Sequence, residues 1–232
     1  MKLSIIIPTF NEERTIEQLL QQIAAVPFPM EVELVLVDDR SEDQTFAIER
    51  RFQETTRQTG IRMFRNPVNQ GKGACIRTGL QQATGDFVIV HDGDLEYDPE
   101  DIPHLLAPIL AQEAAAVYGS RFLKHRWPRG MAWRNYLANQ LLTWLTNQLF
   151  HLHLTDAYTC YKLMRRDLLQ DLQTESNGFE WEAEVTAKLG SRGVAILEIP
   201  ISYHGRSRRE GKKIRPKDLL TGIQTLFRYR AG

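Results

Sequence analysis

FVIVHDGDLEYDP, residues 87–99, combines a predicted strand with a cluster of acids. Four mostly apolar residues, Phe87 to Val90, are typical of a buried strand. They run directly into four carboxylates, which are Asp92, Asp94, Glu96 and Asp98. Gly93 separates the first two acids and permits a tight backbone path. The segment therefore predicts a strand whose carboxyl end presents negative charge to a ligand.

Strands and helices alternate through the first half of the chain. Aliphatic runs predict strands at residues 3–7, 32–39, 61–66, 87–91 and 115–121. Between the first two, apolar residues recur at helical spacing at Ile16, Leu19, Leu20 and Ile23. Asn11 is the predicted cap of this helix. The alternation predicts an α/β fold with a mostly parallel sheet and helices on both faces, whose ligand binds beyond the carboxyl ends of the strands.

The composition is that of an ordinary globular protein. The 232 residues are 42% hydrophobic and 25% charged, which suits a chain with a sizeable core. The two cysteines, Cys75 and Cys160, have no metal-ligand spacing and indicate a reducing compartment. The apolar run before Pro8 is too short for a signal peptide. No run of about 18 apolar residues predicts a membrane-spanning helix.

Positive charge is concentrated near the C-terminus, although the formal net charge of the chain is zero. Residues 204–217, HGRSRREGKKIRPK, hold seven Lys or Arg and one Glu, which is a local charge of +6. The remaining residues therefore carry a charge of −6. Such a basic segment suits a nucleic acid, a phosphorylated small molecule or an anionic membrane.

Residues 135–155 contain no Asp, Glu, Lys or Arg. Leucines recur there at helical spacing, and interspersed amides exclude a spanning helix. One interpretation is a buried core helix, but a surface helix that packs on a core normally has a charged outer face. Trp and Tyr are frequent here, and three arginines precede the segment: Arg126, Arg129 and Arg134. This combination favours an amphipathic helix in a lipid headgroup region.

Asp92 and Asp94 form a candidate metal site. Two carboxylates one residue apart at a strand end can hold a hard divalent cation such as Mg²⁺ or Mn²⁺, whose other ligands are often diphosphate oxygens. Glu96 is a candidate third ligand, directly or through water. A solvated acidic turn is the structural alternative. Further acids at a neighbouring strand end, Asp38 and Asp39, favour the metal site.

Three motifs follow one another along the chain: IIIPTFNEE at residues 5–13, DDRS at 38–41 and DGD at 92–94. In this order they resemble family 2 glycosyltransferases of the GT-A fold. NQGKGACIRTGLQQATGD at 69–86 and EIPISYHGRSRREGKKI at 198–214 are similar to dolichyl-phosphate mannose synthases and bacterial polyprenyl-phosphate hexosyltransferases. The resemblance covers essentially the whole chain. It implies a Rossmann-like, mostly parallel central sheet flanked by helices, with C-terminal amphipathic helices.

The resemblance also implies roles for individual residues. The nucleotide sugar would be bound by Pro8, Phe10, Glu12, Asp39, Lys72 and Asp92. The metal, Mg²⁺ or Mn²⁺, would be held by Asp94 and Glu96, although the family more often has Gln at the second position. Catalytic roles would fall to Asp92, Asp94, Arg121 and Asp156. The acceptor phosphate would be bound by Arg121, Arg134, Arg206 and Lys212.

The implied activity is an inverting transfer of a hexose from a nucleotide-diphosphate sugar to a polyprenyl phosphate of the dolichyl or undecaprenyl type. GDP-mannose is the first expected donor and UDP-glucose the second. Within a single domain, residues 1–232, the nucleotide sugar would bind to residues 1–124, and the acceptor and membrane to residues 125–232. The protein would be cytoplasmic and peripheral on the inner face of the membrane, with no nucleic-acid partner.

Three other functions are compatible with parts of the sequence. A family 2 transferase acting on a sugar hydroxyl requires a general base, for which Asp156 is the candidate, whereas an anionic phosphate acceptor requires mainly positioning. A non-catalytic relative is disfavoured because Asp39, Asp92 and Asp94 are all present. A nucleotidyltransferase is disfavoured because the loop after the first strand, residues 9–13, is acidic.

Overall fold

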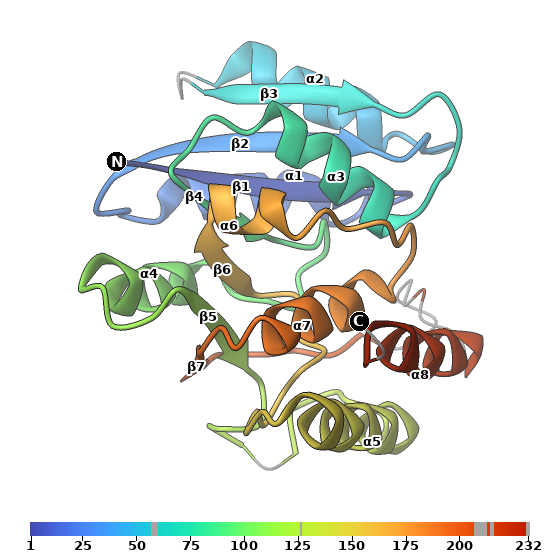
Figure 1. The fold of residues 1–232 in the computed structure, drawn as a ribbon. Coiled ribbons are helices and arrows are strands. Elements are labelled where there is room, and N and C mark those ends of the chain that lie inside the picture. The colour runs from blue at the N-terminus through green and yellow to red at the C-terminus, as the bar shows by residue number, and fades with distance from the viewer. Residues whose placement is uncertain (57–59, 126, 207–212, 214–215, 231–232) are drawn as a thin grey trace.

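The structure is a computed structural model that describes residues 1–56, 60–125, 127–206, 213 and 216–230. In these residues seven strands form one sheet, in the order β3-β2-β1-β4-β6-β5-β7 (Figure 1). Four of its six strand pairings are parallel. The predicted α/β fold with a mostly parallel central sheet is confirmed.

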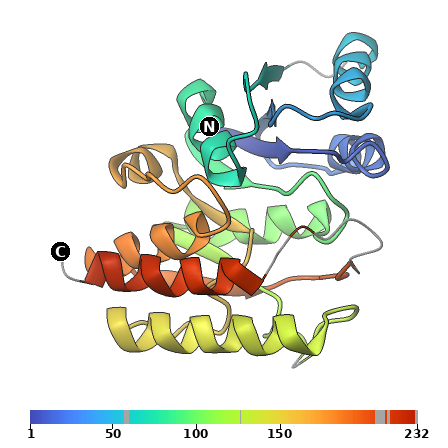
Figure 2. The same ribbon diagram turned by 90° about the vertical axis from the view of Figure 1, so that its right-hand side faces the viewer.

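The first half of the chain supplies four parallel strands. They are β1 (Lys2–Thr9), β2 (Glu31–Asp38), β3 (Ile61–Arg65) and β4 (Phe87–Val90). The helices between them are α1 (Ile16–Ala25), α2 (Thr45–Thr55) and α3 (Lys72–Gln82). α1 and α2 lie on one face of the sheet and α3 on the other (Figure 2). Because both faces are covered, β1, β2 and β4 are almost continuously aliphatic and buried.

The second half extends the sheet through an antiparallel strand. β6 (Lys162–Arg165) lies between β4 and β5 (Ala116–Ser120) and runs antiparallel to both, whereas β7 (Ile196–Pro200) pairs parallel with β5. The remaining helices are η1 (Pro99–Asp101), α4 (Ile102–Leu110), α5 (Trp133–Phe150), α6 (Arg166–Asp171), α7 (Trp181–Ser191) and α8 (Pro216–Arg230).

The apolar stripe predicted for α1 is buried, but its predicted cap is wrong. The buried residues are Ile16, Leu19, Leu20 and Ile23. The helix begins after Thr15, and Asn11 lies in the preceding turn with a left-handed φ of 50°. Its Oδ1 accepts a hydrogen bond from the backbone N–H of Glu42 at 2.9 Å. Asn11 therefore joins two loops at the ligand edge, in a conformation that asparagine tolerates better than most residues.

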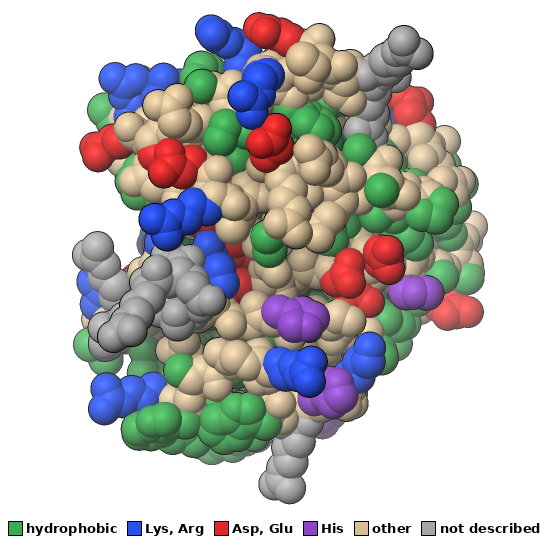
Figure 3. Space-filling view, turned by 180° about the vertical axis from the view of Figure 1, so that it is seen from behind, with side chains coloured by type: hydrophobic (Ala, Val, Ile, Leu, Met, Phe, Trp, Pro, Cys, Tyr) green, Lys and Arg blue, Asp and Glu red, His purple; other side chains and the backbone are tan. Residues whose placement is uncertain are grey.

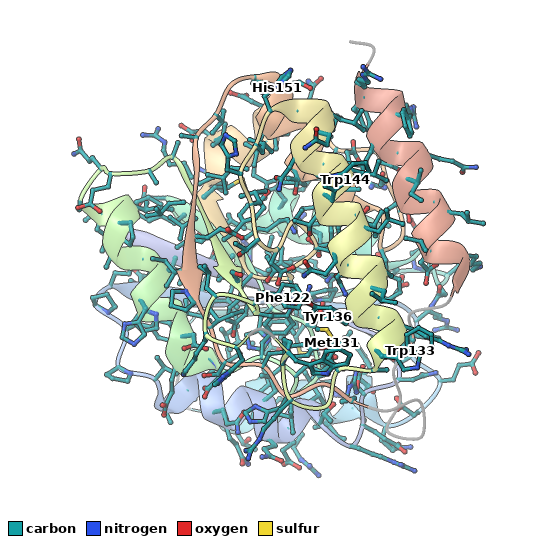
Figure 4. The ribbon with its side chains drawn as sticks, turned by 90° about the horizontal axis from the view of Figure 1, so that it is seen from below. Phe122, Met131, Trp133, Tyr136, Trp144 and His151 are labelled. Atoms are coloured by element: carbon teal, nitrogen blue, oxygen red, sulfur yellow. The ribbon has the colours of Figure 1, made fainter. Side chains whose placement is uncertain are left out.

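α5 and α8 form a layer at the end of the molecule remote from β3. Figure 4 shows the two helices side by side, with Trp133 at one end of α5, Trp144 further along and His151 just past the other end. The inner residues of α5, Leu142, Thr146 and Phe150, are buried. No described helix is both long enough and apolar enough to cross a bilayer. The layer therefore has a packed inner face and an outer face available for other contacts.

Glu49 of α2 supports a prediction about stability. Its side chain is fully buried, and neither carboxylate oxygen has a hydrogen-bond partner among the described residues. Burial raises the pKa of Glu49 to about 8. An unfolded chain releases this proton near pH 4.5, so the folded state loses stability as the pH rises from 4.5 to 8. At about 1.4 kcal/mol per pH unit, the loss approaches roughly 5 kcal/mol.

Glu49→Gln is expected to remove most of this pH dependence, because the amide does not titrate. Urea unfolding at pH 5 and pH 8 measures it: the variant should gain stability relative to the wild type at pH 8. The exposed Glu54→Gln change on the same helix is the control and should leave the pH dependence unaltered. An equal slope in wild type and Glu49→Gln would contradict the prediction.

Candidate active site

A cavity of about 370 Å³ lies at the carboxyl ends of β1, β2 and β4, where the topology places a ligand. Nine of the predicted site residues line it: Pro8, Phe10, Glu12, Asp39, Lys72, Asp92, Asp94, Glu96 and Arg206. The first eight come from four segments of the first half, which are the end of β1 with the loop after it, the loops after β2 and β4, and the start of α3, whereas Arg206 comes from the far end of the chain. The structure thus brings together the acids that follow neighbouring strands.

Four predicted residues are not placed in this cavity. Arg121 and Asp156 are buried and are not among its lining residues. Arg134 is exposed at the start of α5, with its guanidinium 5.3 Å from the ring centre of Trp133. Lys212 lies outside the described residues. Their predicted roles in catalysis and in binding the acceptor phosphate stay predictions.

Asp39 anchors the loop that precedes α3. Its Oδ1 accepts hydrogen bonds from Asn66 Nδ2 (2.8 Å) and the N–H of Gln70 (2.9 Å), and its Oδ2 accepts one from the N–H of Gly71 (2.7 Å). Gly71 has a φ of 100°, and a Cβ atom there would lie 2.4 Å from the carbonyl oxygen of Asn177. A glycine is therefore required for this loop to pass so close to the segment before α7.

Lys72, the first residue of α3, holds the first acid of the DGD motif. Its Nζ lies 2.7 Å from Asp92 Oδ1 and 2.9 Å from Glu182 Oε1 of α7. Burial opposes the charged form of both partners, but their attraction outweighs it. The pKa of Lys72 is raised well above its usual value and the pKa of Asp92 is lowered. Buried Lys162 shares Glu182, so two cations and two acids make one network under the cavity.

Arg206 lies among the other three acids. Its guanidinium is 2.9 Å from Glu12 Oε2 and 2.5 Å from Asp94 Oδ2, and its backbone N–H donates to Glu96 Oε1 at 2.9 Å. Lys213 Nζ adds a second cation at Glu12. Tyr203 donates its hydroxyl hydrogen to Glu96 Oε2. The acidic cluster of Glu12, Asp94 and Glu96 is thus neutralised by two basic residues from the C-terminal stretch.

The same cluster contains the candidate ligands of a divalent metal. Among the described residues, no three His, Cys, Asp or Glu side chains are arranged to hold an ion. Asp94 and Glu96 do supply the hard oxygen donors that Mg²⁺ and Mn²⁺ prefer. Burial, with Asp92 and Glu96, raises the pKa of Asp94 to about 7, as expected where carboxylates crowd together. The donors fit such an ion, provided that Arg206 moves away from Asp94.

Arg121 and Asp156 form a separate buried ion pair. Arg121 Nε and Nη2 donate to Asp156 Oδ2 and Oδ1, both at 2.7 Å, and Nη2 also donates to Asn139 of α5. Burial opposes the charge, yet Asp156 raises the pKa of Arg121 well above its usual value. The pair links the end of β5 to the loop before β6. Both carboxylate oxygens of Asp156 are engaged.

Two contributors to the site were not predicted from the sequence. Glu182 is one of three acids at alternate positions in the segment that becomes α7, and nothing in that pattern singles it out. Tyr203 lies beside the basic stretch but carries no charge pattern. Both act through contacts with residues about a hundred positions away, Lys72 and Glu96. The tyrosine in SYHGR was the available signal, because a buried tyrosine hydroxyl needs a polar partner.

Asp39→Asn is expected to loosen the loop before α3 and weaken nucleotide binding. Asparagine offers one acceptor oxygen where three donors converge, so at least one N–H loses a charge-assisted hydrogen bond worth about 1.5–3 kcal/mol. We expect a loss of that size in the free energy of unfolding, and about tenfold weaker binding of UDP or GDP in calorimetry. Glu42→Gln, an exposed acid nearby, is the control. Unchanged nucleotide affinity in Asp39→Asn would contradict the prediction.

Known proteins are similar in sequence to most of this chain, including the segments that form the site. The sequence model of the family described as Glycosyl transferase family 2 matches residues 4–173. Dodecaprenyl-phosphate galacturonate synthase of Rhizobium johnstonii is 30% identical over all of this chain and 69% of its own length. Dolichol-phosphate mannosyltransferase of Pyrococcus furiosus is 26% identical over 98% of this chain and 63% of its own. The hexosyltransferase Agl6 of Haloferax volcanii is 29% identical over 88% of this chain.

The chain spans about half to two thirds of the length of two of these relatives, 48% of Agl6 and 63% of the Pyrococcus protein. Solved structures agree with the fold. Glucosyl-3-phosphoglycerate synthase from Mycobacterium tuberculosis, in complex with Mn²⁺, UDP and phosphoglyceric acid, aligns with a TM-score of 0.73. The alignment has 22% identity and covers 99% of this chain and 78% of that one. The architecture is therefore that of GT-A proteins.

Proposed function

Because the chain belongs to glycosyl transferase family 2, we propose that it transfers a hexose from a nucleotide-diphosphate sugar to a polyprenyl phosphate, with inversion. The observation that carries the proposal is one cavity holding Asp92, Asp94 and Glu96 together with Lys72 and Arg206. Two relatives are named as a dolichol-phosphate mannosyltransferase and a dodecaprenyl-phosphate galacturonate synthase, which supports a polyprenyl phosphate acceptor. The two names differ in the sugar. From the resemblance of the sequence to dolichyl-phosphate mannose synthases, we propose GDP-mannose as the first donor and UDP-glucose as the second.

Electrostatics would supply most of the catalysis. Negative charge grows on the diphosphate as the sugar leaves, and fixed cations in a buried site stabilise it. In the described part of this chain the cations that line the cavity and can do so are Lys72, Arg206, Lys213 and Lys217. A Mg²⁺ or Mn²⁺ ion held by Asp94 and Glu96 would supply further positive charge to the diphosphate. A manganese ion and GDP-mannose accompany the similar fold of a Pyrobaculum calidifontis mannosyltransferase (TM-score 0.64, 23% identity over 85% of this chain and 54% of that one).

The two parts of the chain would bind different substrates. Residues 1–124 would bind the nucleotide through Pro8, Phe10 and Asp39. Residues 125–232 would receive the acceptor, and Arg206 and Lys213 from this part border the donor cavity as well. An acceptor phosphate is already anionic near neutral pH, so it needs to be positioned against the sugar and does not need to be deprotonated by a base. Such a reaction needs no activated Ser, Cys or His nucleophile.

A transferase that acts on a sugar hydroxyl is the second candidate. It would require Asp156 as general base. Both oxygens of Asp156 accept hydrogen bonds from Arg121, and Asp156 is fully buried. This arrangement favours the phosphate acceptor.

Contact with a membrane would bring the enzyme to its lipid acceptor. Four apolar side chains form one stripe on the outer face of α5: Trp133, Leu137, Leu141 and Trp144, which are 43–58% exposed. Leu220 and Phe227 of the adjacent α8 are also exposed. A stripe with interfacial tryptophans and no charge between residues 135 and 155 suits the headgroup region of a bilayer. We place the protein on the cytoplasmic, inner face as a peripheral enzyme.

The proposal is tested by sugar transfer from a panel of radiolabelled GDP- and UDP-sugars. Each donor is offered with a short polyprenyl phosphate and, separately, with an oligosaccharide, in the presence of Mn²⁺ or EDTA. Transfer into the polyprenyl phosphate that EDTA abolishes is the expected result. Transfer only into the oligosaccharide would favour the second candidate, and activity in EDTA would remove the metal from the proposal.

A further inference from the structure

A second cavity, of about 400 Å³, lies between the loops that follow β5 and β7. Its lining residues are Lys124, His125, Trp127, Arg129, Ser202, Tyr203 and His204. Figure 3 shows Lys, Arg and His side chains gathered on the lower part of the face seen from behind, above a hydrophobic edge of the molecule. This second cavity shares no lining residue with the one described above.

The charge of this cavity is suited to an anion. Its lining includes the side chains of Lys124 and Arg129 and two imidazoles, and no acid. None of the four forms an ion pair within the described part of the chain, whereas Arg121 and Arg206 are already paired with carboxylates. The acid Asp101 is outside the lining, and its carboxylate accepts the backbone N–H of Ser202 at 2.6 Å. Guanidinium, ammonium and imidazole groups together recognise phosphate oxygens.

The backbone around the cavity is fixed by close contacts. The N–H of Gly205 donates to the carbonyl oxygen of Arg129 at 2.9 Å, and Arg129 and His204 form an isolated bridge. A Cβ atom on Gly130 would lie 2.2 Å from the carbonyl oxygen of Gly205, so the two loops approach as closely as glycine allows. Arg129 and His204 are therefore held next to each other by backbone pairing.

This cavity is separate from the one proposed to bind the nucleotide sugar. Tyr203 lines the cavity and is buried, and its hydroxyl bonds to Glu96, which lines the first cavity. Tyr203 and Glu96 thus separate the two spaces. A ligand bound on the far side of Tyr203 and Glu96 would hold the protein in place and would not act as the acceptor.

The surroundings of the cavity indicate where its ligand comes from. Trp127 lines the cavity and is 52% exposed, and Leu123, which precedes Lys124 in the chain, is 47% exposed. The Trp127 ring is fixed by stacking on Tyr136 of α5 at 4.6 Å and by a hydrogen bond from Nε1 to the carbonyl oxygen of Met131. The apolar rim continues into the exposed stripe of α5 that begins at Trp133. Aromatic side chains next to cations are typical of a membrane–water interface.

We propose that this cavity binds the phosphodiester headgroup of an anionic phospholipid in the bilayer, separately from both substrates. Lys124 and Arg129 would take the phosphate oxygens, and His125 and His204 would donate further hydrogen bonds. The inference rests on the membrane contact proposed above and not on the transfer reaction. It gives the protein a fixed orientation at the membrane, with α5 against the lipid and the sugar-nucleotide cavity held at a set distance.

The test is sedimentation with vesicles of phosphatidylcholine alone or mixed with phosphatidylglycerol, at physiological ionic strength. Lys124→Ala/Arg129→Ala should bind the anionic vesicles about thirtyfold more weakly, roughly fivefold for each cation lost, and the neutral vesicles as before. Arg129→Lys keeps the charge but loses bidentate recognition, and should weaken anionic binding by about threefold or more. Arg14→Ala/Arg50→Ala removes two exposed charges elsewhere and should change binding by less than about twofold.

Two further binding measurements distinguish this proposal from the proposed membrane contact and from binding of a phosphate monoester. Trp133→Ser/Trp144→Ser should weaken binding to both kinds of vesicle, which tests the membrane contact itself. Vesicles with phosphatidic acid in place of phosphatidylglycerol distinguish a monoester from a diester. The proposal is overturned if Lys124→Ala/Arg129→Ala binds like the wild type, if the Arg14/Arg50 control loses as much, if Arg129→Lys is unchanged, or if only phosphatidic acid supports binding.

Discussion

Asp94→Asn is expected to lower the rate of sugar transfer by roughly a hundred- to a thousandfold, because charge stabilisation at the leaving diphosphate is the main source of catalysis proposed here. Asparagine keeps the size of the side chain and can still accept the N–H of Glu96, which Asp94 Oδ1 holds at 2.9 Å. It removes the negative charge that pairs with Arg206 and that a divalent ion would require. The effect should appear in kcat for both GDP- and UDP-sugars.

The pH dependence of the metal requirement follows from the same residue. Burial and the neighbouring Asp92 and Glu96 raise the pKa of Asp94 to about 7, so a proton would compete with the cation below that pH. The Mn²⁺ concentration that gives half-maximal transfer should therefore fall as the pH rises through 7 in the wild type. In Asp94→Asn this pH dependence should be lost, because the group no longer titrates.

Asp98→Asn is the matched control for Asp94→Asn. Asp98 follows in the same loop and caps η1 through the N–H of Glu100, a bond that asparagine also makes. Its replacement should change the transfer rate by less than about threefold, since asparagine caps a helix about as well as aspartate does. Transfer by Asp94→Asn at a rate close to that of Asp98→Asn would show that Asp94 holds neither the metal nor the diphosphate.

The sequence alone was enough to predict which strand ends carry the acids. Parallel strands present their carboxyl ends at one edge, so acids that follow β1, β2 and β4 had to meet there. This reasoning needs only strand direction, which the alternation of strands and helices supplies. It holds for Glu12, Asp39, Asp92 and Asp94, all of which line one cavity.

The charge pairing in the site could not be predicted in the same way. Arg206 contacts Asp94, which is 112 positions away in the sequence, and Arg121 contacts Asp156, which is 35 positions away. The spacing of residues along the chain does not predict contacts at such separations. Both arginines follow the end of a strand in the sequence, Arg121 directly after β5 and Arg206 a few residues after β7. Which acid neutralises which arginine depends on the antiparallel insertion of β6. That strand is Lys-Leu-Met-Arg, in which only the two middle residues are apolar, so its pattern does not identify it, unlike the fully apolar β4.

Removing one partner of the Arg121–Asp156 pair is expected to cost about 3–5 kcal/mol in the free energy of unfolding, because a charge then remains buried without compensation. The pair has two hydrogen bonds of 2.7 Å, and both side chains are almost inaccessible to water. Asp156→Asn and Arg121→Met should each show this loss in urea unfolding. The double variant should lose less than the sum, because neither charge remains. Glu17→Gln, which breaks the exposed pair with Arg51, should have little effect.

The kinetics of Asp156→Asn distinguish two roles of Asp156, which are positioning of Arg121 and general-base catalysis. If Asp156 acts by holding Arg121, the variant should retain transfer to polyprenyl phosphate within about tenfold at temperatures where it stays folded, since only the placement of Arg121 suffers. If Asp156 is a general base for a hydroxyl acceptor, transfer should fall by about a hundredfold or more even in folded protein, and the acidic limb of the pH–rate profile should disappear. Because stability and kcat are measured on the same variant, a loss of activity through unfolding cannot be mistaken for the loss of a base.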